Sequence, residues 1–209
     1  MSFVITLFIK CHAFLRRIIT AYYIRYNRFI FKIQNVQYGK DLKVFNKFYL
    51  HKKKSSTIKI GDNLVYTNGD AINPLCRNIR GCINAENNAT IEIGNNVGIS
   101  SACIWAEKYI KIGNNVNIGG DCILIDTDAH NLDYELRRNP STDSTFAISA
   151  PIIIEDDVMI GTRCIVLKGV TIGARSVIGA GSIVTKDIPS DCVAAGNPCR
   201  VIRYFAEEN

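Results

Sequence analysis

Histidine is the side chain best tuned to move a proton near neutral pH, and one histidine of this chain has a distinctive setting. The chain contains His12, His51 and His130. His130 lies in a long polar segment, in the run Asp-Thr-Asp-Ala-His-Asn-Leu-Asp, whereas the other two lie in a basic N-terminal segment and a lysine-rich stretch. Long loops beside a rigid scaffold often carry function. We therefore predict that His130 is a general base, the alternative being an exposed loop histidine.

Two carboxylates precede His130 closely. Asp126 and Asp128 could orient its imidazole, bind a hydroxyl group of a substrate, or cap the loop. A metal site is not expected, because zinc needs several converging His or Cys ligands and His130 has no such neighbours in the sequence. A serine hydrolase is also poorly supported, because the chain lacks a Gly-x-Ser-x-Gly motif.

A repeat of six residues is the element that must position this loop. Between Ile154 and Pro189 every sixth residue is aliphatic: Ile154, Ile160, Val166, Ile172, Ile178 and Val184. Helices repeat near 3.6 residues and strands near two, so a period of six fits a chain that turns a corner every six residues. Three flat sides then make one coil of a triangular prism, and the coils stack by parallel strand pairing.

The fifth position of each block is small and is predicted to point inward. Cys103, Cys122 and Cys164 fall at this position and are interpreted as small interior residues. The eight cysteines lack paired spacing, which favours free thiols, a reducing compartment and a cytoplasmic protein.

Three segments follow along the chain. Residues 1–35 form a helical segment, residues 36–189 form the prism with a long loop over residues 126–151, and residues 190–209 form a tail that packs along the prism. One extra residue near Ala106–Tyr109 interrupts the six-residue period.

Residues 1–35 combine apolar side chains at helical spacing with interleaved arginines and lysines. Such a helix either lies on a membrane surface or covers the open end or flank of the prism, and we favour the second interpretation. No apolar stretch is long enough to span a membrane, and no cleavage site for a signal peptide is evident. The net charge of +6 is too modest and dispersed to predict nucleic-acid binding.

Together, the six-residue repeats, the histidine in DTDAHNLD and the ending IGAGSIVTKDIPSDCVAAGNPCRVIR resemble the hexapeptide-repeat acyltransferases, in particular the galactoside, maltose and polysaccharide O-acetyltransferase branch. The resemblance is good over Ile91–Arg203 and weak over Tyr38–Asn88. It implies a left-handed parallel β-helix, a homotrimer, and transfer of an acetyl group from acetyl-CoA to a hydroxyl. His130 occupies the place of the family's catalytic base.

The resemblance also implies binding residues. The expected coenzyme A contacts are Thr162, Ala180, Thr185, Lys186, Arg200 and Arg203. The expected acceptor contacts are Ser101, Glu107, Asp126, Asp128 and Met159. Two positions depart from the family pattern IGDDVWIG: Glu155 replaces a glycine, and Met159 replaces a tryptophan that lines the cleft. Methionine fills similar volume without a flat stacking face, so the preferred acceptor can differ.

The expected acceptor is a sugar or glycan, free or lipid-linked, used in bacterial surface polysaccharide synthesis. Two alternatives are acetylation of serine or another small molecule, and a non-catalytic structural prism. Serine acetylation is disfavoured because that branch uses a second histidine on its prism. Membrane contact through residues 1–35 would suit a lipid-linked acceptor.

Overall fold

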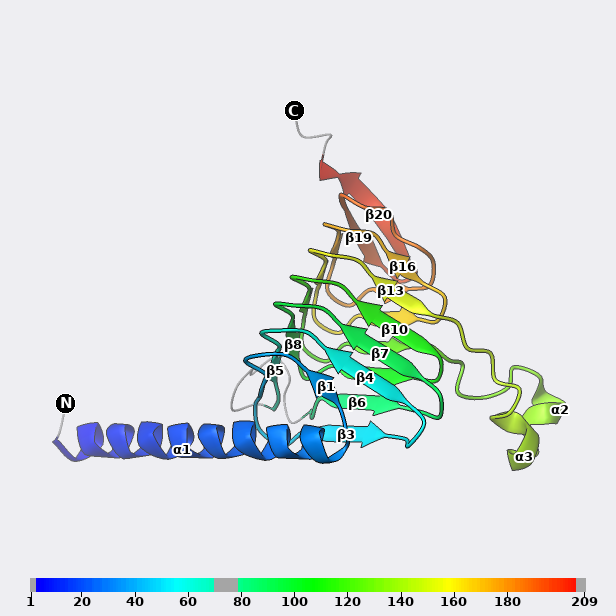
Figure 1. Cartoon of the computed structure of the whole chain (residues 1–209). Helices are drawn as coiled ribbons and strands as arrows, with labels where there is room; N and C mark the ends of the chain where they lie inside the picture. Colours follow the sequence, from blue (N-terminus) through cyan, green and yellow to red (C-terminus); the bar gives the residue numbers. More distant parts are fainter. Residues whose placement is uncertain (1–2, 70–78, 206–209) are drawn as a thin grey trace.

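The computed structural model describes residues 3–69 and 79–205. It is a left-handed parallel β-helix that narrows toward its C-terminal end, with the long helix α1 (Phe3–Ile33) lying across the wide end (Figure 1). The predicted fold class is therefore confirmed. The helix fills most of the N-terminal segment that was expected to be helical.

Short strands form the three sides of the prism, here called sheets A, B and C. Sheet A contains β1 (Gln37–Tyr38), β4 (Thr57–Ile60), β7 (Thr90–Ile93), β10 (Tyr109–Ile112), β13 (Ile152–Ile154) and β16 (Thr171–Ile172). Sheet B contains β2 (Lys43–Val44), β5 (Val65–Thr67), β8 (Gly98–Ser100), β11 (Asn117–Ile118), β14 (Met159–Ile160), β17 (Val177–Ile178), β19 (Cys192–Gly196) and β20 (Cys199–Tyr204). Sheet C contains β3 (Tyr49–Lys52), β6 (Cys82–Ala85), β9 (Cys103–Ala106), β12 (Ile123–Ile125), β15 (Ile165–Leu167) and β18 (Ile183–Val184).

Columns of aligned aliphatic side chains fill the interior. In sheet A, for example, Ile112, Ile154 and Ile172 are direct partners on successive coils, and all three are buried. Apolar burial of this kind is worth about 25 cal/mol per Å². The prediction for Cys103 is wrong: Ala102 takes the interior place, and Cys103 lies half-buried on the outer face of sheet C.

The corner between sheets A and B carries a ladder of polar side chains. The side-chain amide of Asn63 donates to Asn96, that of Asn96 to Asn115, and that of Asn115 to Asp157, over 2.8, 3.1 and 3.0 Å. These four residues all have positive φ, which asparagine and aspartate tolerate better than most residue types. The Asn-Asn pairs that follow Gly94 and Gly113 thus form corners of the prism.

The long loop leaves the prism after β12 and returns at β13 without disturbing the stack. Its two short helices, α2 (Tyr134–Arg137) and α3 (Pro140–Asp143), lie outside the prism (Figure 1). Strand β13 pairs with β10, and β15 pairs with β12, so the coils before and after the loop are direct neighbours. The excursion of residues 126–151 is thus an insertion at one corner.

The tail differs from the expectation that it packs along the prism. Strand β19 continues sheet B by parallel pairing with β17, and β20 folds back antiparallel on β19. The described part of the tail therefore lengthens one side of the prism.

The C-terminal third of α1 covers the first coil. The buried amide of Asn27 donates to the carbonyls of Val44 and Asn46, over 2.8 and 2.9 Å. The ring of Phe31 is also buried, against Tyr38 and Phe48 of the same coil. This part of the helix thus satisfies carbonyls at the open end of the stack, as the favoured interpretation predicted.

We expect Asn27→Ala to lower the free energy of unfolding by about 1–3 kcal/mol, because two carbonyls at the end of the core lose their donor. The measurement is urea unfolding followed by circular dichroism. Arg25→Ala is the control, because Arg25 is exposed on the same helix and should change stability by less than about 0.5 kcal/mol. Equal effects of the two substitutions would contradict the capping role.

Candidate functional site

His130 is held by a carboxylate that lies thirteen positions further along the loop. Its Nδ1 atom is 2.6 Å from Oδ2 of Asp143, the last residue of α3. The second oxygen of Asp143 accepts the backbone N–H of Asn131 over 2.8 Å. Two hydrogen bonds lower the pKa of Asp143: the one from His130 has the larger effect and the one from Asn131 the smaller. The carboxylate is therefore ionised at neutral pH.

Local sequence explains why Asp143 reaches this position. Asn139 caps α3 by accepting the N–H of Ser141, and Pro140 occupies the first turn, where its missing N–H and fixed φ are tolerated. The short helix then turns Asp143 back toward His130. Sequence reasoning missed Asp143, since carboxylates closer in sequence were considered as partners of His130.

With Nδ1–H donating to Asp143, the other ring nitrogen, Nε2, carries the free lone pair. The His130 side chain is 70% exposed, while that of Asp143 is 16% exposed. An oriented imidazole with an accessible Nε2 can accept a proton from a hydroxyl group. This pair is the arrangement in the described chain most suited to general base chemistry.

Asp126 has a structural position that excludes two of its predicted roles. It is fully buried, and its carboxylate accepts the backbone N–H groups of Glu107, Lys108 and Tyr109 over 2.7–2.8 Å. These donors belong to the corner that holds the extra residue of the repeat. Asp126 therefore neither orients His130 nor reaches an acceptor as placed, and it acts as an anchor for this corner and the start of the loop.

Asp128 anchors the loop to the next coil of the prism. Its Oδ1 is 2.6 Å from Nζ of Lys168, which follows β15 on the next coil. The chain also pairs with itself at the base of the loop, between Thr127 and Ser149. Asp128 thus ties the loop to the prism, which among its three alternative roles agrees with that of holding the loop, whereas Nδ1 of His130 pairs with Asp143.

The two remaining polar candidates for acceptor contacts lie in different environments. Ser101 is buried at a corner with positive φ, and its hydroxyl contacts the Thr67 carbonyl and the Gly69 N–H. It is therefore unavailable to an acceptor in this structure. Glu107 is exposed at the corner between sheets C and A, where partial burial and then the charges of Glu86 and Asp126 raise its pKa.

The expected coenzyme A contacts occupy two corners that flank sheet C in the last coils. Thr162 and Ala180 stack at the corner between sheets B and C, whereas Thr185 and Lys186 follow β18 at the corner between sheets C and A. Arg200 and Arg203 lie on β20, and Arg203 stacks on the ring of Phe205. The cations Lys186 and Arg200 are exposed. Exposed cations near the C-terminal end of the prism can bind phosphate groups.

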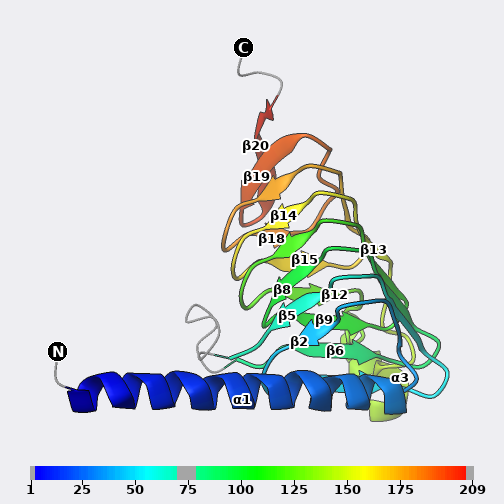
Figure 2. The same cartoon turned by 60° about the vertical axis from the view of Figure 1, so that its left-hand side comes forward.

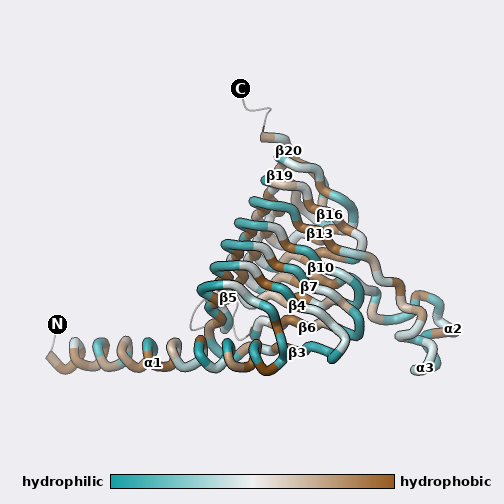
Figure 3. The backbone as a smooth tube through the Cα atoms, viewed as in Figure 1, coloured by the Kyte–Doolittle hydropathy of each residue, from teal (hydrophilic) through white to brown (hydrophobic). Residues whose placement is uncertain are grey.

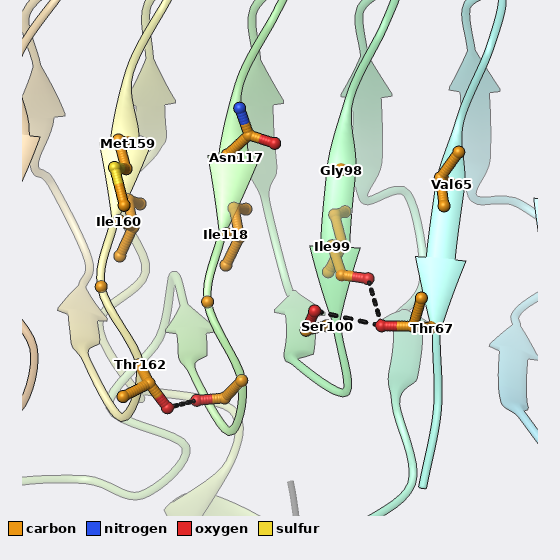
Figure 4. Close-up of a pocket in the computed structure, with 13 residues that line it drawn as sticks. Val65, Thr67, Gly98, Ile99, Ser100, Asn117, Ile118, Met159, Ile160 and Thr162 are labelled. Carbon is orange, nitrogen blue, oxygen red and sulfur yellow. Dashed lines mark hydrogen bonds between the residues drawn. The ribbon is translucent and has the colours of Figure 1, made fainter. Parts of the chain in front are cut away.

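Sheet B carries a groove of about 390 Å³ on its outer face. Met159 and Thr162 line it together with Ser100 and Asn117, and sequence reasoning had assigned Asn117 to no site (Figure 4). Gly98 lies in register with Asn117 and Met159, so its missing side chain leaves the groove open. The alignment of Gly98 with the blocks that follow was the available signal in the sequence.

The groove and His130 do not meet in one chain. The groove runs along sheet B, whereas the loop that carries His130 departs from the corner between sheets C and A. A complete site therefore needs a further surface beside the exposed imidazole.

Comparisons with known proteins point to one family. The family described as "Hexapeptide repeat of succinyl-transferase" matches residues 151–186. Galactoside O-acetyltransferase of Escherichia coli is 44% identical over 121 residues, which cover 58% of this chain and 57% of that protein. A hexapeptide-repeat acetyltransferase of Vibrio cholerae, solved with acetyl-CoA, is 33% identical with a TM-score of 0.52, covering 68% of this chain and 70% of its own. A polySia-specific acetyltransferase is 25% identical with a TM-score of 0.53, covering 81% of each chain.

The match to the curated Escherichia coli relative spans only 57% of that protein.

We expect Asp126→Ala to destabilise the fold by about 3 kcal/mol, because three backbone N–H groups would lose a charged acceptor. Thermal and urea unfolding measure this change. Asp133→Ala is the matched control, since Asp133 is exposed and accepts one N–H at the start of α2, so its loss should cost about 1 kcal/mol or less. Unchanged stability of Asp126→Ala would show that Asp126 is not an anchor.

Proposed function

Because the chain belongs to the hexapeptide-repeat acetyltransferase family, we propose that it transfers an acetyl group from acetyl-CoA to a hydroxyl of a sugar or glycan. The observation that carries the proposal is the pair formed by His130 and Asp143, whose Nδ1–Oδ2 distance is 2.6 Å. It provides an oriented base on a loop that projects from the prism.

The chemistry needs little beyond such a base. A thioester is already activated, whereas an alcohol is almost fully protonated at neutral pH. Nε2 of His130 takes the hydroxyl proton as the oxygen attacks the thioester carbonyl, which is worth about 10²–10⁴-fold in rate. The carbon–sulfur bond then breaks, and the protonated imidazole returns the proton to the departing thiolate. Asp143 stabilises the imidazolium between these steps.

The donor suits the upper part of the prism. Lys186 and Arg200 are exposed cations that can pair with the phosphates of coenzyme A. The outer face of sheet C between the two flanking corners is apolar, with half-buried Ile165, Leu167 and Ile183, and can pack against the pantetheine arm. We assign the donor to this region, with Thr162, Ala180 and Thr185 at its borders.

The acceptor class is supported by the names of the relatives, which include a galactoside O-acetyltransferase and a polySia-specific acetyltransferase. A role in surface polysaccharide synthesis agrees with the second of these. On this chain Met159 is exposed at the groove of sheet B, and Glu107 is exposed at the corner before the loop. Both remain proposed acceptor contacts.

We expect His130→Ala to lower kcat by about 10²–10⁴-fold, because the attacking hydroxyl loses its base. Asp143→Asn should lower kcat by about tenfold or more with KM for acetyl-CoA unchanged, since Asp143 acts through His130. Thiol release from acetyl-CoA across a panel of sugar acceptors measures both effects.

The control for this experiment is Glu135→Gln, which converts an exposed carboxylate of the same loop to an amide away from His130. It should leave turnover unchanged. Full activity of His130→Ala would remove the imidazole from the mechanism. Absence of any turnover in the wild-type protein across the panel would favour the alternatives, a different acceptor class or a structural prism.

We further propose that the site is completed in a homotrimer, in which the loop of one copy faces the groove of sheet B on the next. The exposed imidazole and the separate groove support this arrangement. A cyclic trimer repeats such a contact three times and closes on itself.

Mixing two inactive variants tests the shared site. Asn117→Trp should fill the groove from its exposed position on β11, while His130→Ala removes the base. Each variant alone should be inactive. Mixed and reassembled chains should recover about a quarter of wild-type activity, because one site in four combines an intact loop with an intact groove. Sedimentation must show that mixed trimers have formed. If they form and no activity returns, then either one chain supplies both the loop and the groove of a site, or the groove is not part of the site.

A further inference from the structure

Helix α1 extends well beyond the prism that it covers. A helix of 31 residues is about 46 Å long. Its C-terminal third contacts the first coil, through Asn27 and Phe31, and the rest projects to one side (Figures 1 and 2).

The face of α1 turned away from the prism carries a continuous apolar stripe. Its members recur at separations of three, four and seven residues, which places them on one side of a helix. The stripe consists of Val4, Leu7, Phe8, Leu15, Ile18, Tyr22, Tyr26, Phe29 and Ile33, all of which are exposed. At about 100° per residue the stripe lies opposite to Asn27, although Tyr22 and Tyr26 also line a pocket together with Lys47, Phe48 and Arg80 of the prism. In Figure 3 apolar residues recur along α1, whereas many of the corners of the prism are hydrophilic.

The charges on the same helix have one sign. The sequence from Phe3 to Ile33 contains six basic residues and no aspartate or glutamate. The basic residues are Lys10, Arg16, Arg17, Arg25, Arg28 and Lys32. An apolar stripe beside lysine and arginine is the pattern of helices that lie in the interface of anionic bilayers. No helix among the described residues is long and apolar enough to cross a membrane.

We propose that this stripe docks the protein on a membrane surface that contains anionic lipid. The helix would lie flat, with its stripe among the acyl chains and its cations among the headgroups. The prism would stand upright on its wide end.

A second copy of the chain covers the stripe less well. In the proposed trimer the prisms pack side by side, which brings their sheets and corners together. Helix α1 lies across the wide end (Figure 1), with Asn27 and Phe31 against the first coil, so packing of that kind leaves the opposite face of the helix exposed. Self-association through α1 alone is an outcome that the experiment below detects.

The loop that carries His130 has a related position. Although it leaves the prism four coils up, α2 and α3 lie at the level of α1 in two views (Figures 1 and 2). The loop as a whole exposes apolar side chains, namely Leu132, Tyr134, Phe146 and Ile148. Docking through α1 would bring this loop to the membrane surface, which suits a lipid-linked acceptor. The docking itself does not rest on the proposed acetyl transfer, although its benefit for catalysis does.

Flotation of the full-length protein with vesicles tests the proposal. One set of vesicles contains phosphatidylcholine alone, and the other adds phosphatidylglycerol. We expect the wild-type protein to float with the anionic set, to bind the neutral set weakly, and to detach as salt rises.

Two isoleucines make a matched pair of variants. Ile9 and Ile18 are 51% and 50% exposed, and they lie nine positions apart, which places them on opposite sides of the helix at about 100° per residue. Ile18→Glu should lower the bound fraction about tenfold, whereas Ile9→Glu, with the same change in charge, should lower it less than about twofold.

Three results would overturn the proposal. The first is that the wild type does not float with anionic vesicles, and the second is that Ile9→Glu and Ile18→Glu lower the bound fraction equally. The third is that Ile18→Glu dissociates an oligomer while the wild type does not bind vesicles. Sedimentation velocity and circular dichroism establish the oligomeric state and folding of each variant. Turnover with a soluble acceptor separates this proposal from the proposed function. Flotation requires no acetyl-CoA, and Ile18→Glu should keep its turnover of a soluble acceptor even though it no longer binds vesicles.

Discussion

Each coil of the prism depends on residues that accept positive φ where the chain turns. Such a conformation costs an L-amino acid about 1–2 kcal/mol, less for asparagine and aspartate. At the corner between sheets A and B it recurs in every coil, in Asp41, Asn63, Asn96, Asn115, Asp157, Arg175 and Asp191. Hydrogen bonds between coils offset this cost, each worth about 0.5–1.5 kcal/mol. The corner therefore forms only when neighbouring coils align, which keeps the stack in register.

The corner between sheets C and A is less regular, and the departures of functional interest occur there. Its length varies: the aligned residues Ile104 and Ile112 are eight positions apart across it, whereas Val166 and Ile172 are six apart, and the whole loop of residues 126–151 departs from it one coil after Ile104. The carboxylate of Asp126, the first residue of the loop, accepts hydrogen bonds from the backbone of Glu107–Tyr109 at the same corner of the preceding coil. Lys168 on the following coil then holds Asp128. The loop is thus fastened to the scaffold on both neighbouring coils.

This fastening explains how an exposed histidine can still be well oriented. The rigid coils fix the two ends of the loop, α3 supplies Asp143 from within it, and the short contact between Asp143 and His130 sets the imidazole. The same loop descends toward the wide end, where α1 lies. In the proposed arrangement the exposed cations Lys186 and Arg200 bind the donor, the stripe on α1 faces a membrane surface, and α2 and α3 of the loop lie at the level of α1.

The sequence by itself determined the architecture, because a period of six residues is compatible with very few folds, and it repeats across the coils. It also made His130 the candidate base, since the loop that carries it is the longest break in that period. Ser101 and Cys103 were misassigned because the corner between β8 and β9 is one residue shorter than the next one along the prism: Ile99 and Ile104 are five positions apart, whereas their partners Ile118 and Leu124 are six apart. Asp126 was misassigned because a repeat pattern does not show which polar side chains of a corner are buried. Tertiary structure alone decided the partner of His130, because the chain must fold back through α3 to bring Asp143 within 2.6 Å. It also decided the direction of the stripe on α1. Helical spacing shows that a stripe exists, but only the docking of Asn27 and Phe31 on the first coil determines that the stripe faces away from the prism.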